Sequence, residues 1–225
     1  MLWVLLVILA LVLILGPNLW VKYTLKRYAQ ERGDIPGTGG ELAEHLVTRF
    51  ELPRVAVETT QEGRDHFDFK QHAVRLSPSV FNGRSLTAVA VAAHEVGHAI
   101  AHEKKQPISH LSSRYLPLAH GLNRIAGALL LGWPVISVLL HLPYAVPLHA
   151  AVVGLSGLLA VFVHLAMLPE EWDASFKKAL PILAEGNYVH AEDLPKIKRI
   201  LTACAMTYVA AALMRILFVW RWFRR

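Results

Sequence analysis

Long apolar runs alternate with short polar stretches along the 225 residues of this chain. Residues 1–21, 121–142 and 148–168 are mostly apolar and are long enough to cross the hydrocarbon core of a bilayer as helices. A fourth run, 201–220, is interrupted by Arg215 and either spans the bilayer or lies partly against the other helices. A fifth run, 86–101, is shorter and carries histidines and an acid. The pattern predicts a mainly α integral membrane protein with about four transmembrane helices and one modest polar region.

The breaks in this pattern predict five segments. Residues 1–29 form an N-terminal membrane anchor helix, which we expect to be retained because no Ala-x-Ala cleavage site follows it. Residues 30–120 form the polar region. Residues 121–168 form a transmembrane hairpin, residues 169–199 a polar helix and loop, and residues 200–225 a membrane helix with a basic tail.

The pattern of apolar residues in the polar region predicts one helix, a small sheet and a second helix. Glu41–Phe50 has the apolar spacing of a helix, which Pro53 ends. Residues 86–101 predict a buried helix that begins at Ser85 as its N-cap. Asp193 to Pro195 predict a later helix start. Short alternating stretches predict three strands, at 54–59, 67–69 and 73–77.

Composition supports the membrane interpretation and excludes two alternatives. Hydrophobic residues make up 54% of the chain, charged residues only 18%, and the mean hydropathy is +0.39. The net charge of +6 is explained most simply by Lys and Arg near membrane ends. The sequence contains no basic stripe interleaved with aromatic residues, the pattern that would indicate nucleic-acid binding. The single cysteine, Cys204, excludes an intrachain disulfide and a paired-cysteine metal site.

The shorter apolar run contains the pattern H-E-x-x-H. His94 and His98 are four residues apart, so a helix aims both imidazoles at one point, and Glu95 projects to the rim of the same face. Two neutral ring nitrogens can hold Zn²⁺, and the carboxylate can take a proton from an attacking water. Burying these groups is costly unless something binds them, although a buried polar cluster satisfied by its neighbours, or a pore lining, is the alternative.

A catalytic zinc ion takes three protein ligands, so the sequence must supply one more. His102 lies roughly 12 Å along the helix from His94, too far to share the ion with both partners. Glu170 and Glu171 follow the apolar run that ends at residue 168, and spacing alone leaves either of them as the third ligand. The alternative for both is a solvated helix N-terminus.

The strand predicted at Val74, Arg75, Leu76 and Ser77 comes shortly before this helix. We expect it to be an exposed edge that holds a peptide substrate by strand addition, with a purely structural hairpin as the alternative.

The chain resembles the YugP-like neutral zinc metallopeptidases along nearly its whole length. The resemblance implies a bacterial membrane-bound gluzincin, similar in logic to HtpX-type proteases, with a zincin-like catalytic core in residues 30–120. It is carried by Ser85–Ile100, Asp65–Asp68, Val74–Ser77, Leu168–Pro169 with Glu171–Ser175, and Leu201–Leu213.

Carried over by residue, the resemblance implies one Zn²⁺ per chain held by His94, His98 and Glu171, with Glu95 as general base. An Asp often follows the ligand Glu by four residues in gluzincins, whereas this chain has Ser175 there and Asp173 two residues earlier. Either of these residues can be the group that orients a metal-binding histidine. The oxyanion stabiliser is unassigned, with His190, Tyr208 and His120 as candidates.

These observations predict a membrane-bound zinc metalloendopeptidase that hydrolyses peptide bonds of membrane or unfolded proteins. We expect its partners to be a protein or peptide substrate and the lipid bilayer, and we expect no binding of nucleic acid. Lys and Arg near the predicted spans indicate a multi-pass inner-membrane protein whose site faces the cytoplasm. The alternatives are a membrane-anchored zinc-binding scaffold without protease activity and a small transporter with histidines along its pathway.

Overall fold

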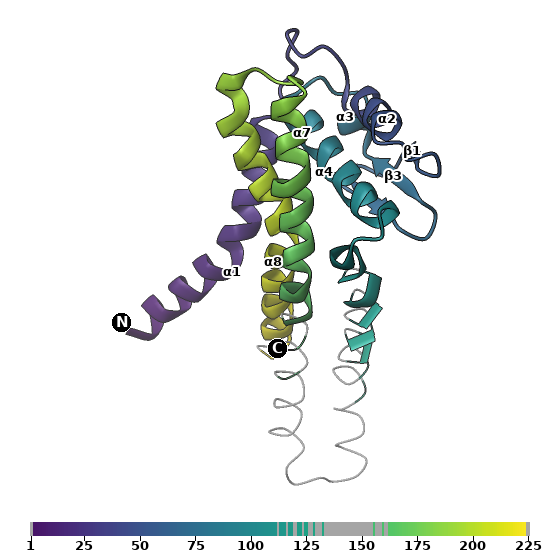
Figure 1. The fold of residues 1–225 in the computed structure, drawn as a ribbon. Coiled ribbons are helices and arrows are strands. Elements are labelled where there is room, and N and C mark those ends of the chain that lie inside the picture. Colours follow the sequence, from purple (N-terminus) through teal and green to yellow (C-terminus); the bar gives the residue numbers. More distant parts are fainter. Residues whose placement is uncertain are drawn as a thin grey trace. The chain divides into compact units, whose positions relative to one another are not determined.

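The computed structural model describes residues 2–111 and 162–223 continuously, with scattered positions between 113 and 159 (Figure 1). The chain divides into two compact units. One consists of Met1–Asn18, Leu111–Met167 and Tyr208–Arg225, and the other of Leu19–His110 and Leu168–Thr207. The second unit contains the sheet and all of the predicted metal ligands, and it is described in detail below.

The elements are mostly helices with one small sheet, as predicted. The helices are α1 (Leu2–Arg27), α2 (Gly39–Arg49), α3 (Pro78–Phe81), α4 (Leu86–Glu103), α7 (Leu180–Glu185) and α8 (Leu194–Phe223), with the short turns η1 (Pro107–His110), η2 (Asp173–Ala179) and η3 (Ala191–Asp193). The strands are β1 (Ala56–Thr59), β2 (His66–Asp68) and β3 (Ala73–Leu76).

The prediction of about four transmembrane helices is wrong. Among the residues that the structure describes, no helix carries an apolar stretch that is long enough to cross a membrane. Helices α1 and α8 occupy the first and last apolar runs. The hairpin predicted for residues 121–168 lies largely outside the described residues.

The described side chains of these two helices are buried in some places and exposed in others. In α8 the side chains of Ile197, Ile200 and Leu201 are fully buried. Near the end of α1, Val21 and Thr24 are buried as well. In α1, by contrast, Leu9, Val12, Leu13 and Leu19 are more than half exposed. An apolar run in the sequence does not show which of its side chains pack into the protein.

The sheet has the order β1-β3-β2, with β3 parallel to β1 and antiparallel to β2. The middle strand is therefore paired on both sides, and the prediction that Val74–Ser77 forms an exposed substrate-binding edge is wrong. Strand periodicity indicates that a strand exists but does not give the order in which strands pair.

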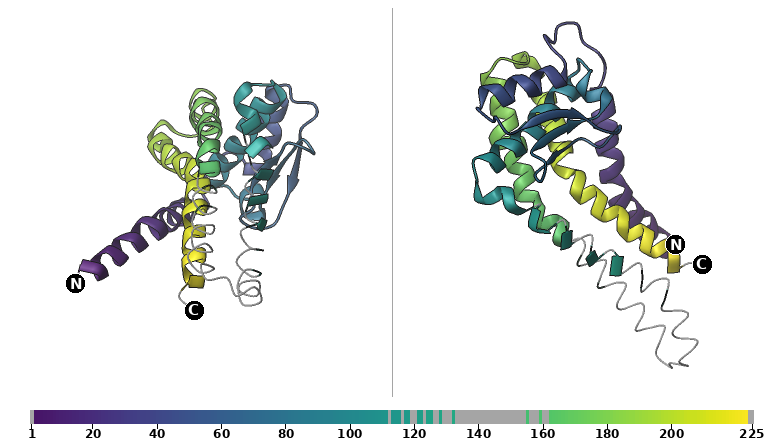
Figure 2. Two further views of the ribbon diagram at one scale, coloured as in Figure 1. Left: turned by 90° about the horizontal axis from the view of Figure 1, so that it is seen from below. Right: turned by 90° about the vertical axis from the view of Figure 1, so that its right-hand side faces the viewer.

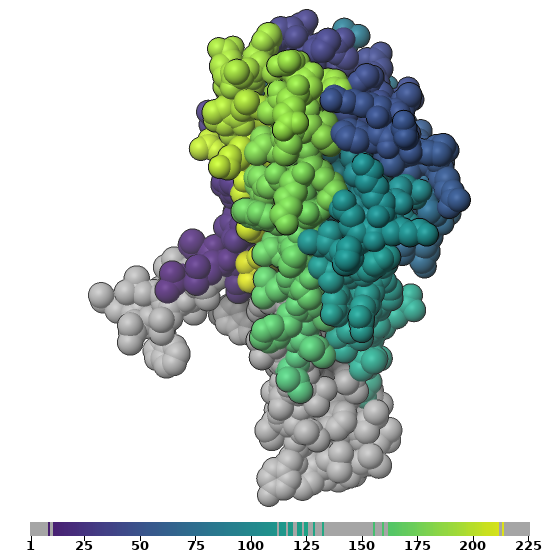
Figure 3. Space-filling view, in the orientation of Figure 1, coloured from purple at the N-terminus to yellow at the C-terminus, as the bar shows by residue number. Residues whose placement is uncertain are grey.

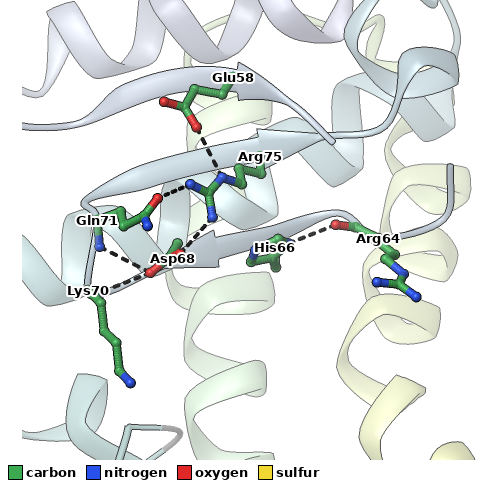
Figure 4. Close-up of polar contacts among 7 residues, drawn as sticks. All are labelled: Glu58, Arg64, His66, Asp68, Lys70, Gln71 and Arg75. Carbon is green, nitrogen blue, oxygen red and sulfur yellow. Dashed lines mark hydrogen bonds and ion pairs between the residues drawn. The ribbon is translucent and has the colours of Figure 1, made fainter. Parts of the chain in front are cut away.

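The side chains of this strand have structural partners. Val74 and Leu76 are fully buried in the core. Arg75 joins the three strands, because its Nε lies 3.0 Å from Glu58 of β1 and its guanidinium lies 2.7 Å from Asp68 of β2 (Figure 4). Ser77 donates from its backbone N–H to the Asp65 carboxylate at 2.6 Å.

Helix α4 is the central element of the second unit. It contacts the sheet through β2 and β3, and it contacts η2 and α7 on another side (Figure 2). Its predicted N-cap is confirmed, since the Ser85 hydroxyl accepts from the N–H of Ala88 at 3.1 Å. Nearly every residue from Leu86 to Ala101 is buried, because the helix itself carries small and apolar side chains on all of its faces.

The start of α2 is fixed by a capping box and by a close contact. The Thr38 hydroxyl accepts from the N–H of Glu41, whose carboxylate accepts from the N–H of Thr38. Gly39, the first helical residue, lies against the backbone of α3 and α4. A Cβ atom there would stand 2.3 Å from the carbonyl oxygen of Val80 and 3.0 Å from that of Ala88.

We expect Gly39→Ala to destabilise the fold by about 1–3 kcal/mol, because backbone atoms must move to admit the methyl group. The matched control is Gly33→Ala, since no atom lies within 4 Å of the Cβ position of Gly33. Urea unfolding of both variants measures the difference. Equal free energies of unfolding for the two variants would show that the contact at Gly39 is unimportant.

Candidate metal centre

The first two donors of the centre come from consecutive turns of α4. His94 and His98 lie four residues apart, and their rings meet edge to face with centroids 4.8 Å apart. The two Nε2 atoms are 3.3 Å from one another. His94 is 4% exposed, so these imidazoles converge inside the protein.

The third donor comes from the segment that leads into η2. Residues 162–172 are helical and continue into the π-helical turn of η2, where Ala174 and Ser175 are fully buried against α4. The green segment around η2 lies directly against the teal segment of α4 (Figure 3). The side chain of Glu171, just before η2, is thereby directed to the two histidines.

A glycine in α4 permits this close approach. A Cβ atom on Gly97 would stand 2.9 Å from the carbonyl oxygen of Ala174 and 3.4 Å from the Cβ of Lys178. The middle of the H-E-x-x-H pattern therefore has a packing role as well: it lets the backbone of η2 come close enough for Glu171 to reach the histidines.

The three donor atoms form a nearly equilateral triangle. Glu171 Oε2 lies 3.2 Å from His94 Nε2 and 3.4 Å from His98 Nε2, and the two nitrogens are 3.3 Å apart. Zinc binds such atoms at about 2.0–2.2 Å in tetrahedral geometry, which places ligand atoms about 3.3–3.5 Å from one another. The chemistry and the spacing of the three donors therefore fit a Zn²⁺ ion with one coordination position left open.

A serine fixes the orientation of one histidine. The Ser175 hydroxyl has one proton, which it donates to the carbonyl oxygen of Leu201 at 3.1 Å. Its oxygen, 3.0 Å from His94 Nδ1, must then accept from the Nδ1–H of that ring. The lone pair of His94 is thereby on Nε2, the atom that faces Glu171.

A second acid lies behind the other histidine. Glu170 Oε1 is 3.8 Å from His98 Nδ1, and the carboxylate is buried. The two adjacent acids that the sequence left as alternatives therefore approach opposite nitrogens of the same ring. Glu171 faces the nitrogen directed to His94, and Glu170 lies on the far side.

Glu95 is buried beside this triangle, and its exposed fraction is 8%. Burial raises the pKa of Glu95 above its usual value, and the charges of Glu171 and Asp65 act in the same direction, while the two histidines oppose them. A carboxylate with a raised pKa is a stronger base than a solvated one, which suits a group that must accept a proton and release it again.

His98 and Glu171 shift one another in opposite directions. Burial by itself would lower the pKa of His98, but the negative charge of Glu171 outweighs it and raises the pKa well above its usual value. Burial would raise the pKa of Glu171, but His98 and His94 lower it to about 2. A proton on His98 and a cation at the centre therefore compete for the same site.

The comparisons agree with this chemistry. Residues 3–225 match the family described as "Putative neutral zinc metallopeptidase". The chain belongs to this family. It is 32% identical over 204 residues to a Bacillus subtilis (strain 168) protein named "Putative membrane protease YugP", covering 88% of this chain and 87% of that protein. No solved structure matches the chain.

Several residues that the sequence offered as parts of the centre are not placed at the three donor atoms by the structure. Asp173 forms a buried ion pair with Lys178 and lies 3.9 Å from Lys177, so the structure gives it cationic partners in place of a ligand histidine. His190 is exposed and lies 3.4 Å from Asp34. Tyr208 belongs to the other unit, where its ring lies near that of His164, and His120 is outside the described residues.

Sequence reasoning did not give the roles of three groups around the candidate centre. These are Asp65, which precedes β2 and contributes to the shifted pKa of Glu95, Glu170 as a neighbour of His98, and the carbonyl of Leu201 that orients Ser175. Glu170 had a signal in its position next to Glu171, and Asp65 had one in the segment Asp65–Asp68 that carries the family resemblance. The role of the Leu201 carbonyl depends on a tertiary contact alone.

We expect Gly97→Ala to weaken Zn²⁺ binding at least tenfold, because the methyl group pushes η2, and with it Glu171, away from α4. Gly97→Val should weaken binding further. Dissociation constants from competition with a chromogenic chelator measure both effects, with Gly33→Ala as the control. Unchanged affinity in Gly97→Val would contradict the packing role of this glycine.

Metal affinity should also depend on pH. Below the raised pKa of His98 a proton must leave before a cation binds, so the affinity for Zn²⁺ should rise with pH, by up to about tenfold per pH unit, until that pKa is passed. Equilibrium dialysis at fixed ionic strength measures this slope. A flat profile would mean that His98 is not a ligand.

Proposed function

We propose that this chain is a zinc-dependent endopeptidase whose ligands are His94, His98 and Glu171 and whose general base is Glu95. The observation that carries the proposal is the triangle of donor atoms, with sides of 3.2–3.4 Å, beside a buried carboxylate. Membership of a family described as zinc metallopeptidases supports the same reaction.

The residues of the chain divide the chemistry among them. When bound, zinc supplies Lewis-acid chemistry, which makes a water more acidic and polarises the scissile carbonyl. Glu95 takes a proton from the attacking water as its oxygen bonds to the carbonyl carbon. The same carboxyl group then gives that proton to the amine nitrogen as the C–N bond breaks. Ser175 keeps His94 in the tautomer whose Nε2 is free to bind.

The burial of the centre suggests the class of substrate. The side chains of His94, His98 and Glu171 are no more than 11% exposed. A scissile bond must therefore enter the protein, which an extended, unfolded segment can do and a folded surface cannot. We accordingly propose unfolded proteins, including unfolded parts of membrane proteins, as substrates.

Association with the inner membrane, with the centre on the cytoplasmic side, is part of the proposal. The relative is named a membrane protease, and that name supports the location. The excess of Lys and Arg beside the apolar runs supports the side.

Glu95→Gln should reduce cleavage about 100- to 10,000-fold and leave the zinc content unchanged, because the amide cannot accept the proton while the three ligands remain. Release of fluorescence from a labelled unfolded protein measures the rate, and mass spectrometry of the metal measures zinc. The matched control is Glu44→Gln, on an exposed face of α2, which should retain the full rate.

Cleavage by Glu95→Gln at the rate of the unmodified chain would refute the role of this residue. If the unmodified chain holds zinc but cleaves no unfolded protein, the alternative of a zinc-binding scaffold is favoured.

A further inference from the structure

A second group of metal-binding side chains lies one helical turn beyond His98. His102 and Glu103 belong to the last turn of α4, and His72 immediately precedes β3. Glu103 Oε1 is 2.6 Å from His72 Nδ1 and 3.4 Å from His102 Nδ1. One ligand atom from each of the three residues lies within 4.8 Å of the others.

The fold holds these donors in place from two separate elements. The connection from β2 to β3 is closed by Asp68, whose carboxylate accepts from the N–H groups of Lys70 and Gln71 (Figure 4). His72 follows with a left-handed φ of 50°, a conformation that a residue with a side chain adopts only when the surrounding structure requires it. The ring of His102 is fixed between neighbours, 5.3 Å from that of His72 and 5.5 Å from that of Phe67.

We propose that His72, His102 and Glu103 bind a second divalent transition-metal ion, which ties the start of β3 to the end of α4. Two imidazole nitrogens and one carboxylate oxygen form a donor set that holds zinc in catalytic sites, and it is the same set as in the first centre. The site is independent of the proposed peptidase reaction, because none of its ligands belongs to the first centre.

The shortest of the distances indicates what the ion replaces. At 2.6 Å, the Nδ1–H of His72 donates a hydrogen bond to Glu103. A bound cation takes the place of the hydrogen-bonded proton, and its ligand atoms then lie about 3.3–3.5 Å apart, so the pair separates by less than 1 Å. The side chains are 34%, 22% and 15% exposed for His72, His102 and Glu103, which leaves water access to a fourth coordination position.

The expected consequence is structural. The last turn of α4 and the connection before β3 approach one another here through side chains. A cation bound by both elements holds them together more strongly than one hydrogen bond, and it stabilises the folded state by mass action. Since α4 also carries His94 and His98, the ion would fix the end of the helix that presents the first centre.

The test counts Zn²⁺ in the full-length chain, stripped with a chelator and titrated with Zn²⁺ alone. We expect two ions for the unmodified chain and one for the His94→Ala/His98→Ala double variant. Adding His102→Gln to the double variant should leave none and abolish the rise of a few degrees in Tm that zinc produces in the double variant. His66→Gln, an exposed histidine on β2, is the matched control and should not change the count in either background.

His72→Gln is the second variant, because it removes a ring nitrogen but can still donate a hydrogen bond to Glu103; it should lose the second ion and keep the fold. The proposal is overturned if the double variant binds no zinc, or if it binds one ion that neither His72→Gln nor His102→Gln removes. If His94 and His98 do not bind zinc, the result is different: the number of Zn²⁺ ions per chain would not fall when these two residues are replaced.

Discussion

The close contact between Gly97 of α4 and the backbone of η2 determines the geometry of the candidate centre. Because Gly97 has no side chain, the carbonyl oxygen of Ala174 can come close to the helix. A Cβ atom on Gly97 would stand only 2.9 Å from that oxygen. Glu171 and Ser175 lie on either side of this contact, and both reach His94. A larger separation of the two segments would leave the acid too far from the histidines to share one ion. The packing of two backbones thus sets the distances on which the chemistry depends.

Burial gives this arrangement its chemical consequence. Two imidazoles and two acids, Glu170 and Glu171, lie with Glu95 in a part of the protein that excludes most water. Such a group of charges is costly unless it is neutralised, and a divalent cation neutralises it more completely than one proton can. The same burial raises the pKa of Glu95 and prepares it to exchange a proton. Binding of the ion and readiness of the base therefore have one cause.

Local sequence signals predicted local structure well. The cap at Ser85, the helical spacing of His94 and His98, and the alternation of three short strands all describe features that neighbouring residues determine, and the structure contains them. The pairing order of β3, the π-helical turn at η2 and the hydrogen bond from Ser175 to Leu201 depend on residues far apart in the chain, and no local pattern encodes them. The apolar runs show the same limit, since Leu201, which begins the last run, is a core residue, whereas Leu13 in the first run is exposed.

The spacing of histidines along α4 connects these observations. His94, His98 and His102 repeat every four residues and therefore follow one face of the helix. The first two meet an acid from the segment before η2, and the third lies beside an acid of its own turn and a histidine of the sheet connection. The segment that brings Glu171 and the strand that begins after His72 are thus both positioned against the same helix. A displacement of α4 along its axis would disturb both groups of donors together, so whatever fixes the helix at one end also preserves the geometry at the other.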